Sequence, residues 1–387
     1  MTNMQMNNKK LGIYVHIPFC KSKCGYCDFC SHTPKENEID RYLNALMLNI
    51  QDFSGAAEGY TVDTIFIGGG TPTLLSKKQM KELVECIRTS FKIEKGAEFT
   101  VEANPGTVDK RYLTALVNMG INRISFGLQS ASDTELRALG RIHTRDEFSE
   151  SFKAARAAGF KNINVDLMYG IPHQTKESFD RTLAFVKSLS PEHISVYGLK
   201  IEEGTPFFEK QDTLPLPDEE AEYKMYREAD KTLTDAGYKH YEISNYARRG
   251  FESKHNMRYW LDELYLGFGV SAHSYFGGQR YAYTDDIEAY IREMEHPTKM
   301  ENILSECTTI NVYTKETEYV MLRLRLFDGL CLSEYRKEFD RDFISKYGKA
   351  LEPFIDGGFM KLSSDSIAFT VKGMYVSNYI LSELLDF

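Results

Sequence analysis

Short runs of apolar and β-branched residues alternate along the first half of the chain with stretches in which apolar residues recur at helical spacing. Six of these runs are predicted to be strands, at 11–17, 64–67, 98–103, 123–127, 162–168 and 193–199. A segment with helical spacing follows each run, for example 76–91, with Ser76 as its expected N-cap, and 176–188. This alternation predicts an α/β fold with a parallel sheet.

Polar residues stand at the ends of nearly all the predicted strands. A cysteine-rich loop follows the first strand and a glycine run, 68–73, follows the second, while Glu102, Gln129 and Asp166 lie at or near the ends of later strands. Ligand sites gather at the carboxyl ends of parallel strands, and a barrel draws on all of its strands. The pattern therefore favours a partial (β/α)6 barrel over an open doubly wound sheet.

The strand-helix alternation breaks after Pro206. A long helix is predicted at 219–236, and the stretch 238–283 is rich in aromatic residues. From 314 onward the spacing predicts helices at 316–326, 333–343 and 345–356, a hairpin at 359–370 and a closing helix, which together suggest a mainly helical, winged-helix-like domain. The predicted domains are the partial barrel at 1–210, a barrel extension at 211–304 and a C-terminal domain at 305–387.

Composition and charge exclude several classes of protein. Hydrophobic residues make up 42% and charged residues 27% of the 387 residues, as in ordinary globular proteins. The formal net charge of −9 disfavours a polyanion or an anionic membrane surface as the main partner, and residues 305–387 hold ten Lys plus Arg against thirteen Asp plus Glu. Residues 1–10 are polar, and no run approaches the roughly 18 apolar residues that span a bilayer. We therefore expect a cytoplasmic protein that does not bind nucleic acid.

Four of the seven cysteines lie between residues 20 and 30, which favours metal ligation in a reducing compartment over a disulfide framework. Three of them, Cys20, Cys24 and Cys27, could wrap one iron-sulfur centre and leave one iron open to a small molecule. The alternative is a zinc site with Cys30 or His32 as the fourth ligand, although paired C-x-x-C knuckles would then be expected. Cys30 is not assigned as a cluster ligand. The three remaining cysteines are expected in the core: Cys86, Cys307 and Cys331.

The glycine run 68–73 has no following Lys and no G-x-G-x-x-G spacing, so it matches neither a P-loop nor a dinucleotide turn. Consecutive glycines at a strand end would let a ligand approach the backbone, although a tight turn remains the alternative. Glu102, Gln129, Arg141 and Asp166 could hold the amine, carboxylate and ribose of a nucleoside-amino-acid cofactor, or could be paired structural charges. His255 lies among aromatic residues and could be an axial ligand for a flat macrocycle.

Taken together, the cysteine triad with an aromatic residue before its third member, the run 68–73 and the six βα units resemble the radical S-adenosylmethionine (SAM) superfamily. Within it, the motifs at 14–20 and 165–172 resemble the anaerobic coproporphyrinogen III oxidase, or coproporphyrinogen dehydrogenase, family along essentially the whole chain. That family contains oxygen-independent dehydrogenases, which convert coproporphyrinogen III to protoporphyrinogen IX by oxidative decarboxylation, and haem chaperones.

Three features make the chain more similar to the chaperones. Only 19 residues precede Cys20, whereas the dehydrogenases are known for a longer N-terminal extension, and Phe29 stands where the dehydrogenases have another cysteine. The segment 255–260 fits the H-N-x-x-Y-W signature associated with haem handling. The resemblance therefore implies a chaperone that delivers haem to acceptors such as respiratory cytochromes, with the dehydrogenase as the alternative.

The resemblance also implies site residues and partners. Cys20, Cys24 and Cys27 would ligate a [4Fe-4S] cluster whose open iron binds the amine and carboxylate of S-adenosylmethionine. An electron from the reduced cluster would cleave the SAM to give a 5′-deoxyadenosyl radical, so an electron donor is expected. The implied SAM site consists of Tyr14, Tyr26, Gly69, Gly70, Thr71, Glu102, Gln129, Arg141 and Asp166. The implied haem residues are His255, Asn256, Tyr259 and Trp260. Peripheral membrane association is compatible with haem acceptors in membranes.

Overall fold

The computed structural model describes residues 9–296 and 300–385. The chain forms two compact units, each assembled from separate stretches of sequence. Unit 1 comprises Met1–Asp166, Leu199–Pro215 and Glu263–Thr309, and unit 2 comprises Leu167–Gly198, Leu216–Asp262 and Ile310–Phe387. The two units are thus interleaved along the chain. The division into three consecutive domains expected from the sequence stays a prediction.

Unit 1 contains a run of parallel strands formed by β1 (Lys9–Ile17), β2 (Tyr60–Gly69), β3 (Ile93–Ala103) and β4 (Arg123–Gln129). The alternate β1 residues Leu11, Ile13, Val15 and Ile17 are fully buried, which explains why this strand was readily predicted. The strands β2 and β3 begin several residues earlier than expected. Glu94, Lys95 and Gly96 near the start of β3 are exposed, so hydrophobic periodicity could not mark that start.

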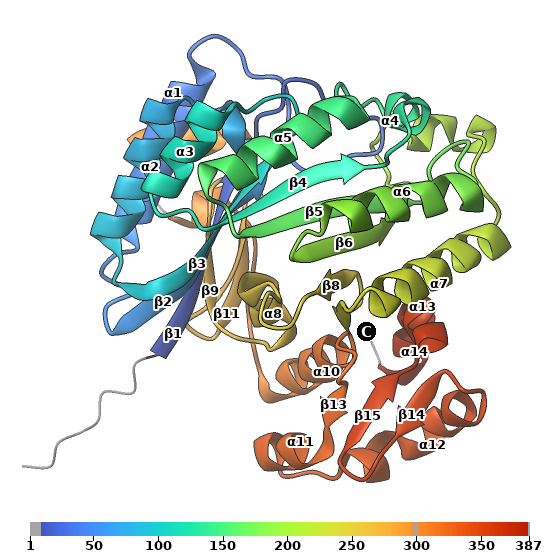
Figure 1. Ribbon diagram of the computed structural model, residues 1–387. Helices are drawn as coiled ribbons and strands as arrows, with labels where there is room; N and C mark the ends of the chain where they lie inside the picture. Colours follow the sequence, from blue (N-terminus) through green and yellow to red (C-terminus); the bar gives the residue numbers. More distant parts are fainter. Residues whose placement is uncertain (1–8, 297–299, 386–387) are drawn as a thin grey trace, which may run out of the picture. The chain divides into compact units, whose positions relative to one another are not determined.

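Helices connect the parallel strands of unit 1 and lie beside them (Figure 1). The helices are α1 (Glu38–Asp52), α2 (Lys77–Ser90), α3 (Lys110–Asn118), α4 (Asp133–Ala138) and α5 (Arg145–Ala158). Helix α2 begins where the sequence predicts, because the Ser76 hydroxyl accepts a hydrogen bond from the Gln79 amide and the Gln79 side chain accepts one from the Ser76 amide. Short 3-10 turns lie at Pro72–Leu74, Phe208–Thr213 and Met300–Ile303.

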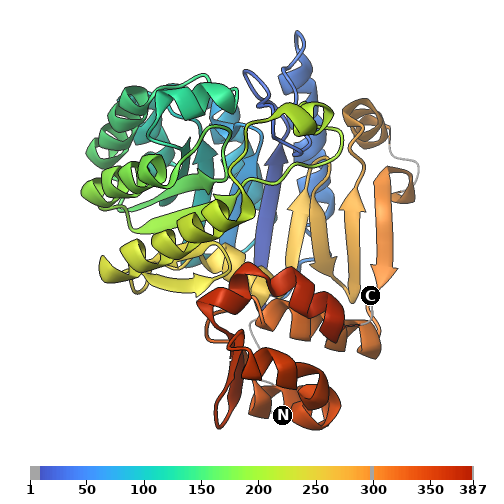
Figure 2. The same cartoon turned by 90° about the vertical axis from the view of Figure 1, so that its right-hand side faces the viewer.

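On its other side β1 pairs in parallel with β9 (Tyr265–Phe268), and antiparallel strands extend the sheet further, as Figure 2 shows. These strands are β10 (His273–Phe276), β11 (Gln279–Tyr283) and β12 (Leu304–Thr309), with α9 (Ile287–Glu295) before β12. Among the described strands β12 pairs only with β11, so the sheet is open, as a partial barrel requires. Cys307 lies exposed on this edge strand, so its predicted burial was wrong, while Cys331 is half-buried and Cys86 is buried.

The chain passes from unit 1 to unit 2 within β5 (Asn162–Tyr169). Unit 2 contains an antiparallel group of strands. In that group β8 (Asn245–Ala247) pairs with both β6 (His193–Gly198) and β7 (Lys239–Glu242). Helices α6 (Lys176–Leu189) and α7 (Glu219–Asp235) have the extents predicted to within a few residues, because each has a strong apolar stripe and a capping residue at its start. The short helix α8 (Lys254–Trp260) follows β8.

The C-terminal part of unit 2 is mainly helical with a small sheet, as expected. It contains α10 (Val312–Arg323), β13 (Leu330–Cys331), α11 (Leu332–Phe339), α12 (Phe343–Asp356), β14 (Met360–Leu362), β15 (Ser366–Phe369), α13 (Val371–Tyr375) and α14 (Ser377–Leu384). The order β13-β15-β14 adds one short strand to the predicted hairpin. Across the described ranges, no helix combines the length and apolar character needed to cross a bilayer.

The buried hydroxyl of Tyr42 joins three elements of unit 1. It donates a hydrogen bond to the His16 carbonyl in β1 (2.8 Å) and accepts one from the Val270 amide after β9 (3.2 Å). The Tyr42 ring also packs edge-on against Phe19, which directly precedes Cys20. This side chain of α1 therefore helps fix the end of β1 from which the cysteine-rich loop departs.

We expect Tyr42→Phe to destabilise the protein by about 1–3 kcal/mol, because it leaves a buried carbonyl and a buried amide without their partner. The measurement is the urea midpoint of unfolding followed by circular dichroism. Tyr313→Phe is the matched control, since the Tyr313 side chain is 58% exposed. Equal midpoints for the two variants would contradict a structural role for the Tyr42 hydroxyl.

Candidate functional site

The cysteine-rich loop leaves β1 and is closed at its base by backbone hydrogen bonds. The Cys20 amide donates to the His32 carbonyl (2.9 Å), and the His32 amide donates to the Pro18 carbonyl (3.0 Å). Farther along, the Gly25 amide donates to the Leu139 carbonyl (3.2 Å) after α4. The loop is thus held at its base and near its middle, with Cys20 buried and Cys24 and Cys27 half-buried.

The three predicted ligand thiols lie near one another. Burial raises the pKa of Cys27, and the neighbouring Cys24 and Cys20 raise it further. Among the residues described, no three His, Cys, Asp or Glu side chains are grouped closely enough to hold a single metal ion. A multi-iron cluster is wider than one ion, and three cysteine thiols on a short loop are the type of donor set that it uses. The residues present fit such a cluster.

A continuous set of hydrogen bonds connects two of these sulfurs through residues from three other loops. The Arg141 guanidinium donates to Cys24 Sγ (3.6 Å) and to Asn104 Oδ1 (2.7 Å). The Asn104 amide donates to Thr71 Oγ1 (2.7 Å), whose hydroxyl donates to Cys20 Sγ (3.6 Å). We call Arg141, Asn104 and Thr71 the thiol belt. Its Thr71 hydroxyl and Arg141 guanidinium place a hydrogen-bond donor against each of the two sulfurs.

The glycine run packs the end of β2 closely against the cysteine loop. A Cβ atom at Gly70 would lie 2.6 Å from the Phe19 carbonyl oxygen and 3.0 Å from Cys20 Sγ. Gly69 has a φ of 111°, and its amide donates to Glu102 Oε2 (3.0 Å). The space expected for a ligand beside these glycines is therefore partly taken by the loop itself, which gives the glycines a packing role.

Two half-buried acidic residues of the site, Glu102 and Asp166, act on each other electrostatically. Asp166 accepts hydrogen bonds from the Ser125 hydroxyl (2.9 Å) and the Asn164 amide (2.7 Å). Burial, followed by the charge of Asp166, raises the pKa of Glu102 to about 8. Glu102 is therefore mainly protonated at neutral pH in the absence of a ligand, and a cationic amine bound beside it would favour its ionised form.

Gln129 ends β4, as predicted, in a left-handed conformation with a φ of 67°. Such a conformation is uncommon for a residue other than glycine and is concentrated at functional sites. Arg141 does not pair with a carboxylate as a structural ion pair would; it donates to Asn104 and to the Gly127 carbonyl (2.9 Å). Close to it, burial raises the pKa of Tyr26 above its usual range, while Arg141 opposes that shift.

A tyrosine-histidine relay runs behind the cysteine loop. Burial lowers the pKa of His16, so its ring is neutral at physiological pH. Its Nε2 lies 2.8 Å from the Cys30 carbonyl, which can only accept, so Nε2 carries the proton. Nδ1 therefore accepts from the Tyr14 hydroxyl (2.9 Å). The sequence interpretation missed His16 as well as Ser125 and Asn164; a polar residue inside an apolar strand was the only available signal.

Cys30 and Phe29 differ in surroundings from the three predicted ligands. The Cys30 thiol contacts the Asp285 carbonyl at 3.7 Å, and burial raises its pKa. Phe29 is 60% exposed. That Cys30 is not a cluster ligand stays a prediction, as do the ligand roles of the other site residues.

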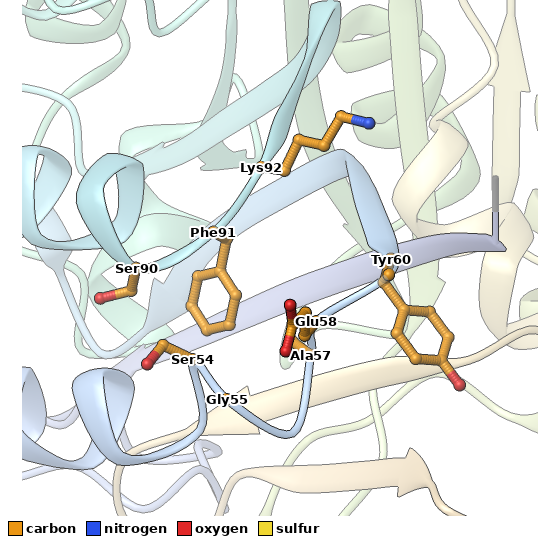
Figure 3. A pocket seen from close by; sticks show the side chains of 9 residues that line it. Ser54, Gly55, Ala57, Glu58, Tyr60, Ser90, Phe91 and Lys92 are labelled. Atoms are coloured by element: carbon orange, nitrogen blue, oxygen red, sulfur yellow. The ribbon is translucent and has the colours of Figure 1, made fainter. Parts of the chain in front are cut away.

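A separate cavity of about 680 Å³ lies at the opposite ends of the strands. Figure 3 shows its lining, which includes Phe91, Tyr60 at the start of β2, and Lys92 just before β3. Because β2 is ten residues long, this cavity is roughly 30 Å along the strand from the glycine run. It does not include any of the predicted site residues.

The predicted haem segment forms α8 in unit 2. Its N-cap, Ser253, accepts a hydrogen bond from the Asn256 amide. His255 is 1% exposed, and its Nε2 lies 2.7 Å from the Tyr259 hydroxyl, with the two rings nearly perpendicular. Asn256, Tyr259 and Trp260 are half-buried. His255 would therefore have to exchange its tyrosine partner before Nε2 could bind iron.

Glu242, at the end of β7, is fully buried near this helix. Burial raises its pKa to about 7, and Asn245 and the Trp260 indole oppose the shift. Neither carboxyl oxygen meets hydrogen-bond geometry with a partner, and the same holds for Trp260 Nε1. The sequence interpretation missed Glu242, because a lone carboxylate in a short strand gives no pattern.

Comparison with known proteins gives concordant results over the whole chain. The family model described as the radical SAM superfamily matches residues 14–186, and the HemN C-terminal domain matches residues 316–376. The chain is 36% identical to the haem chaperone HemW of Bacillus subtilis, over 96% of this chain and 98% of that protein. It is also 36% identical to the haem chaperone HemW of Escherichia coli, over 87% and 91% of the two chains. The solved structure of coproporphyrinogen III oxidase (HemN) from Escherichia coli, a radical SAM enzyme, superimposes with a TM-score of 0.86 at 26% identity and covers 98% of this chain and 91% of that chain.

The raised pKa of Glu102 predicts a pH dependence of stability. The folded protein holds the Glu102 proton up to about pH 8, whereas the unfolded chain releases it near 4.5, so stability should fall as pH rises through this window. Glu102→Gln should match the wild type near pH 4.5 and exceed it by on the order of 2–4 kcal/mol at pH 8.5. Urea unfolding of the ligand-free protein at several pH values measures this. Glu150→Gln, at an exposed position of α5, is the control, and a parallel pH profile for Glu102→Gln and wild type would contradict the assignment.

Proposed function

This chain belongs to the haem chaperone HemW family of radical SAM proteins, and from that membership we propose that it binds haem and delivers it to acceptor proteins such as respiratory cytochromes. The observation that carries the proposal is the match to relatives of that name along nearly the whole of both chains. Phe29 supports it, because it stands where the resemblance to the dehydrogenases would require another cysteine.

The proposal assigns a [4Fe-4S] cluster to Cys20, Cys24 and Cys27, with the open iron available to SAM. The thiol belt supports this assignment, since its hydroxyl and guanidinium donors lie against Cys20 and Cys24. Together the cluster and SAM supply one-electron reductive cleavage of a carbon-sulfur bond when they are bound.

The SAM site in this proposal consists of residues that surround the loop and the strand ends. Arg141 carries the positive charge that suits the SAM carboxylate, and Glu102 would release its proton to pair with the SAM amine. Asp166, held by Ser125 and Asn164, suits ribose hydroxyls. The remaining proposed SAM residues are Tyr14, Tyr26, Gly69, Gly70, Thr71 and Gln129.

Haem is the cargo in this proposal, and α8 is the proposed contact segment through His255, Asn256, Tyr259 and Trp260. The hydrogen bond between His255 and Tyr259 supports a switch in which the tyrosine releases Nε2 when haem arrives. We place this action in the cytoplasm, with docking to the membrane surface where the haem acceptor is embedded there.

The alternative function is oxygen-independent oxidation of coproporphyrinogen III to protoporphyrinogen IX. The close superposition on coproporphyrinogen III oxidase favours it, because the two chains share the fold over nearly their whole length. An anaerobic incubation of reconstituted protein with reductant, SAM and coproporphyrinogen III distinguishes the two functions. Formation of protoporphyrinogen IX would overturn the chaperone proposal, and its absence together with haem binding would support it.

The cluster assignment predicts different outcomes for neighbouring cysteines. Cys24→Ala should abolish cluster assembly, because two remaining thiolates do not hold the centre. Cys30→Ala should leave the iron content unchanged, since its thiol lies against the Asp285 carbonyl. Both variants are measured after reconstitution by iron and sulfide analysis and by the thiolate-to-iron charge-transfer absorbance at roughly 400 nm. Iron loss in Cys30→Ala would instead make Cys30 a ligand.

The haem assignment predicts that His255→Ala weakens haem binding at least about tenfold, equivalent to about 1.4 kcal/mol. Because His255 is buried, Tyr259→Phe serves as a second variant that keeps the histidine and removes its hydroxyl partner. An absorbance titration with haem measures both, and the shifted Soret band of Tyr259→Phe would report altered ligation. His296→Ala, at an exposed histidine, is the matched control. Wild-type binding by both α8 variants would remove this segment from the haem site.

A further inference from the structure

Three neighbouring side chains of unit 2 have buried polar atoms that lack a hydrogen-bond partner. Glu242 ends β7, Asn245 begins β8 and Trp260 ends α8. Both carboxyl oxygens of Glu242, the side-chain oxygen of Asn245 and the indole nitrogen of Trp260 meet hydrogen-bond geometry with none of the described residues. Such atoms are rare in folded proteins, because each has lost its hydration without compensation. Several of them in one place indicate a contact that a small rearrangement would complete.

The backbone holds Glu242 more firmly than it holds Trp260. Glu242 pairs with Asn245 across the short turn that joins β7 to β8, and it forms an isolated antiparallel bridge with Leu326. Trp260 is the last residue of a helix of only seven residues. We therefore expect the C-terminal end of α8, rather than the β7–β8 hairpin, to move when the contact is completed.

The side chains are complementary as donor and acceptor. The indole N–H of Trp260 can only donate, and an ionised carboxyl group accepts through both of its oxygens. Trp260 and Asn245 already act on Glu242, since both oppose the rise in its pKa that burial causes. A metal ion is a poor candidate for this place, because the described residues contain no group of three His, Cys, Asp or Glu that could hold one.

We propose that Glu242 is a positioning residue for the proposed haem segment, and that its carboxyl group accepts a hydrogen bond from the Trp260 indole when α8 takes up haem. This inference rests on the proposed function. At the start of α8, His255 has to give up its hydrogen bond with Tyr259 before Nε2 can bind iron. The bond gained between Glu242 and Trp260 at the other end of the helix would offset that loss. We call this interaction the Glu242–Trp260 contact.

The charge of Glu242 sets the strength of the Glu242–Trp260 contact. Burial raises the pKa of Glu242 to about 7, and an ionised carboxylate accepts a stronger hydrogen bond than a neutral one. The contact is therefore stronger above pH 7 than below it. The Glu242 charge also acts on Tyr226 and Tyr246, whose pKa values burial raises far above this range. Burial lowers the pKa of His240, which is hydrogen-bonded to Asp230.

Further charged or titratable side chains lie on α8 and on the segment that bridges to Glu242: His255, Arg258, Arg325 and Asp328. The arginines keep their charge throughout the accessible pH range. Asp328 is exposed and paired with Lys239. His255 lies on the same helix as Trp260, so the test has to separate its effect from that of Glu242.

Trp260 is the only tryptophan of the chain, so all tryptophan fluorescence comes from the Glu242–Trp260 contact. Without haem, we expect the emission to change with a midpoint at about pH 7 in the wild type and in the control Glu352→Gln, an exposed position of α12. Glu242→Gln keeps the size of the side chain and cannot ionise, so the transition should disappear, while circular dichroism confirms the fold. A transition that persists in Glu242→Gln would belong to another group, such as His255, and would overturn the proposal.

Haem titrations followed by absorbance test the connection to the cargo. We expect the wild type to bind haem more tightly at about pH 8 than at about pH 6, and Glu242→Gln and Trp260→Phe each to weaken binding about tenfold at the higher pH. Because both substitutions remove the same hydrogen bond, the double variant should bind no more weakly than either single variant. Losses that multiply in the double variant, or wild-type affinity in Glu242→Gln, would overturn the proposal.

The two measurements separate this inference from the proposed function. Absence of haem binding by the wild type would overturn the proposed function, and the role of the Glu242–Trp260 contact in haem uptake with it. The fluorescence titration needs no haem and decides by itself whether Glu242 acts on Trp260.

Discussion

The thiol belt is the interaction on which the candidate site depends. Arg141, Asn104 and Thr71 come from separate loops, yet their hydrogen bonds run without a break from Cys24 to Cys20. Two backbone bonds add to it: the Gly70 amide donates to the Ile17 carbonyl (2.8 Å) and the Thr71 amide donates to the Phe19 carbonyl (2.7 Å). These bonds hold the sulfurs of Cys20 and Cys24 in fixed positions, which is the order that the proposed cluster ligands would need. Asn104 is central because it is bound to both other members of the belt.

Several ionisable groups of the candidate site in unit 1 have shifted pKa values because they are shielded from water. Glu102 and Asp166 cannot both be ionised at low cost, and burial shifts the balance so that Glu102 keeps its proton. The charge of buried Arg123 opposes the Glu102 shift. The hydrogen bonds printed for Arg141 go to an amide, a carbonyl and a sulfur. In the proposed SAM site, the amine and carboxylate of the ligand would balance both charges. The neutral His16 behind the loop adds order without adding charge.

Unit 2 contains two buried polar residues in and beside the proposed haem segment. His255 is buried and bound to Tyr259, and Glu242 is buried without a hydrogen-bond partner that meets the geometric criteria. Buried polar atoms in that condition carry a free-energy cost, which a ligand or a rearrangement can relieve. The H-N-x-x-Y-W segment is therefore folded with its histidine hydrogen-bonded, while the adjacent Glu242 carboxyl is not. The helix itself is short, so a few interactions decide its position.

The sequence by itself determined the parallel βα units, the helix starts marked by capping residues such as Ser76, and the positions of the three clustered cysteines. These features are local: hydrophobic periodicity, caps and ligand spacing all act within a few residues. The resemblance to a known family supplied the expected SAM and haem residues. Only the tertiary structure decided that Asn104 joins Thr71 to Arg141, that Glu102 lies close enough to Asp166 to feel its charge, and that the aromatic-rich stretch contributes strands beside β1. It also placed Cys307 on an exposed edge instead of in the core. These outcomes depend on which distant segments meet, and pairing between distant segments leaves no local pattern in the chain.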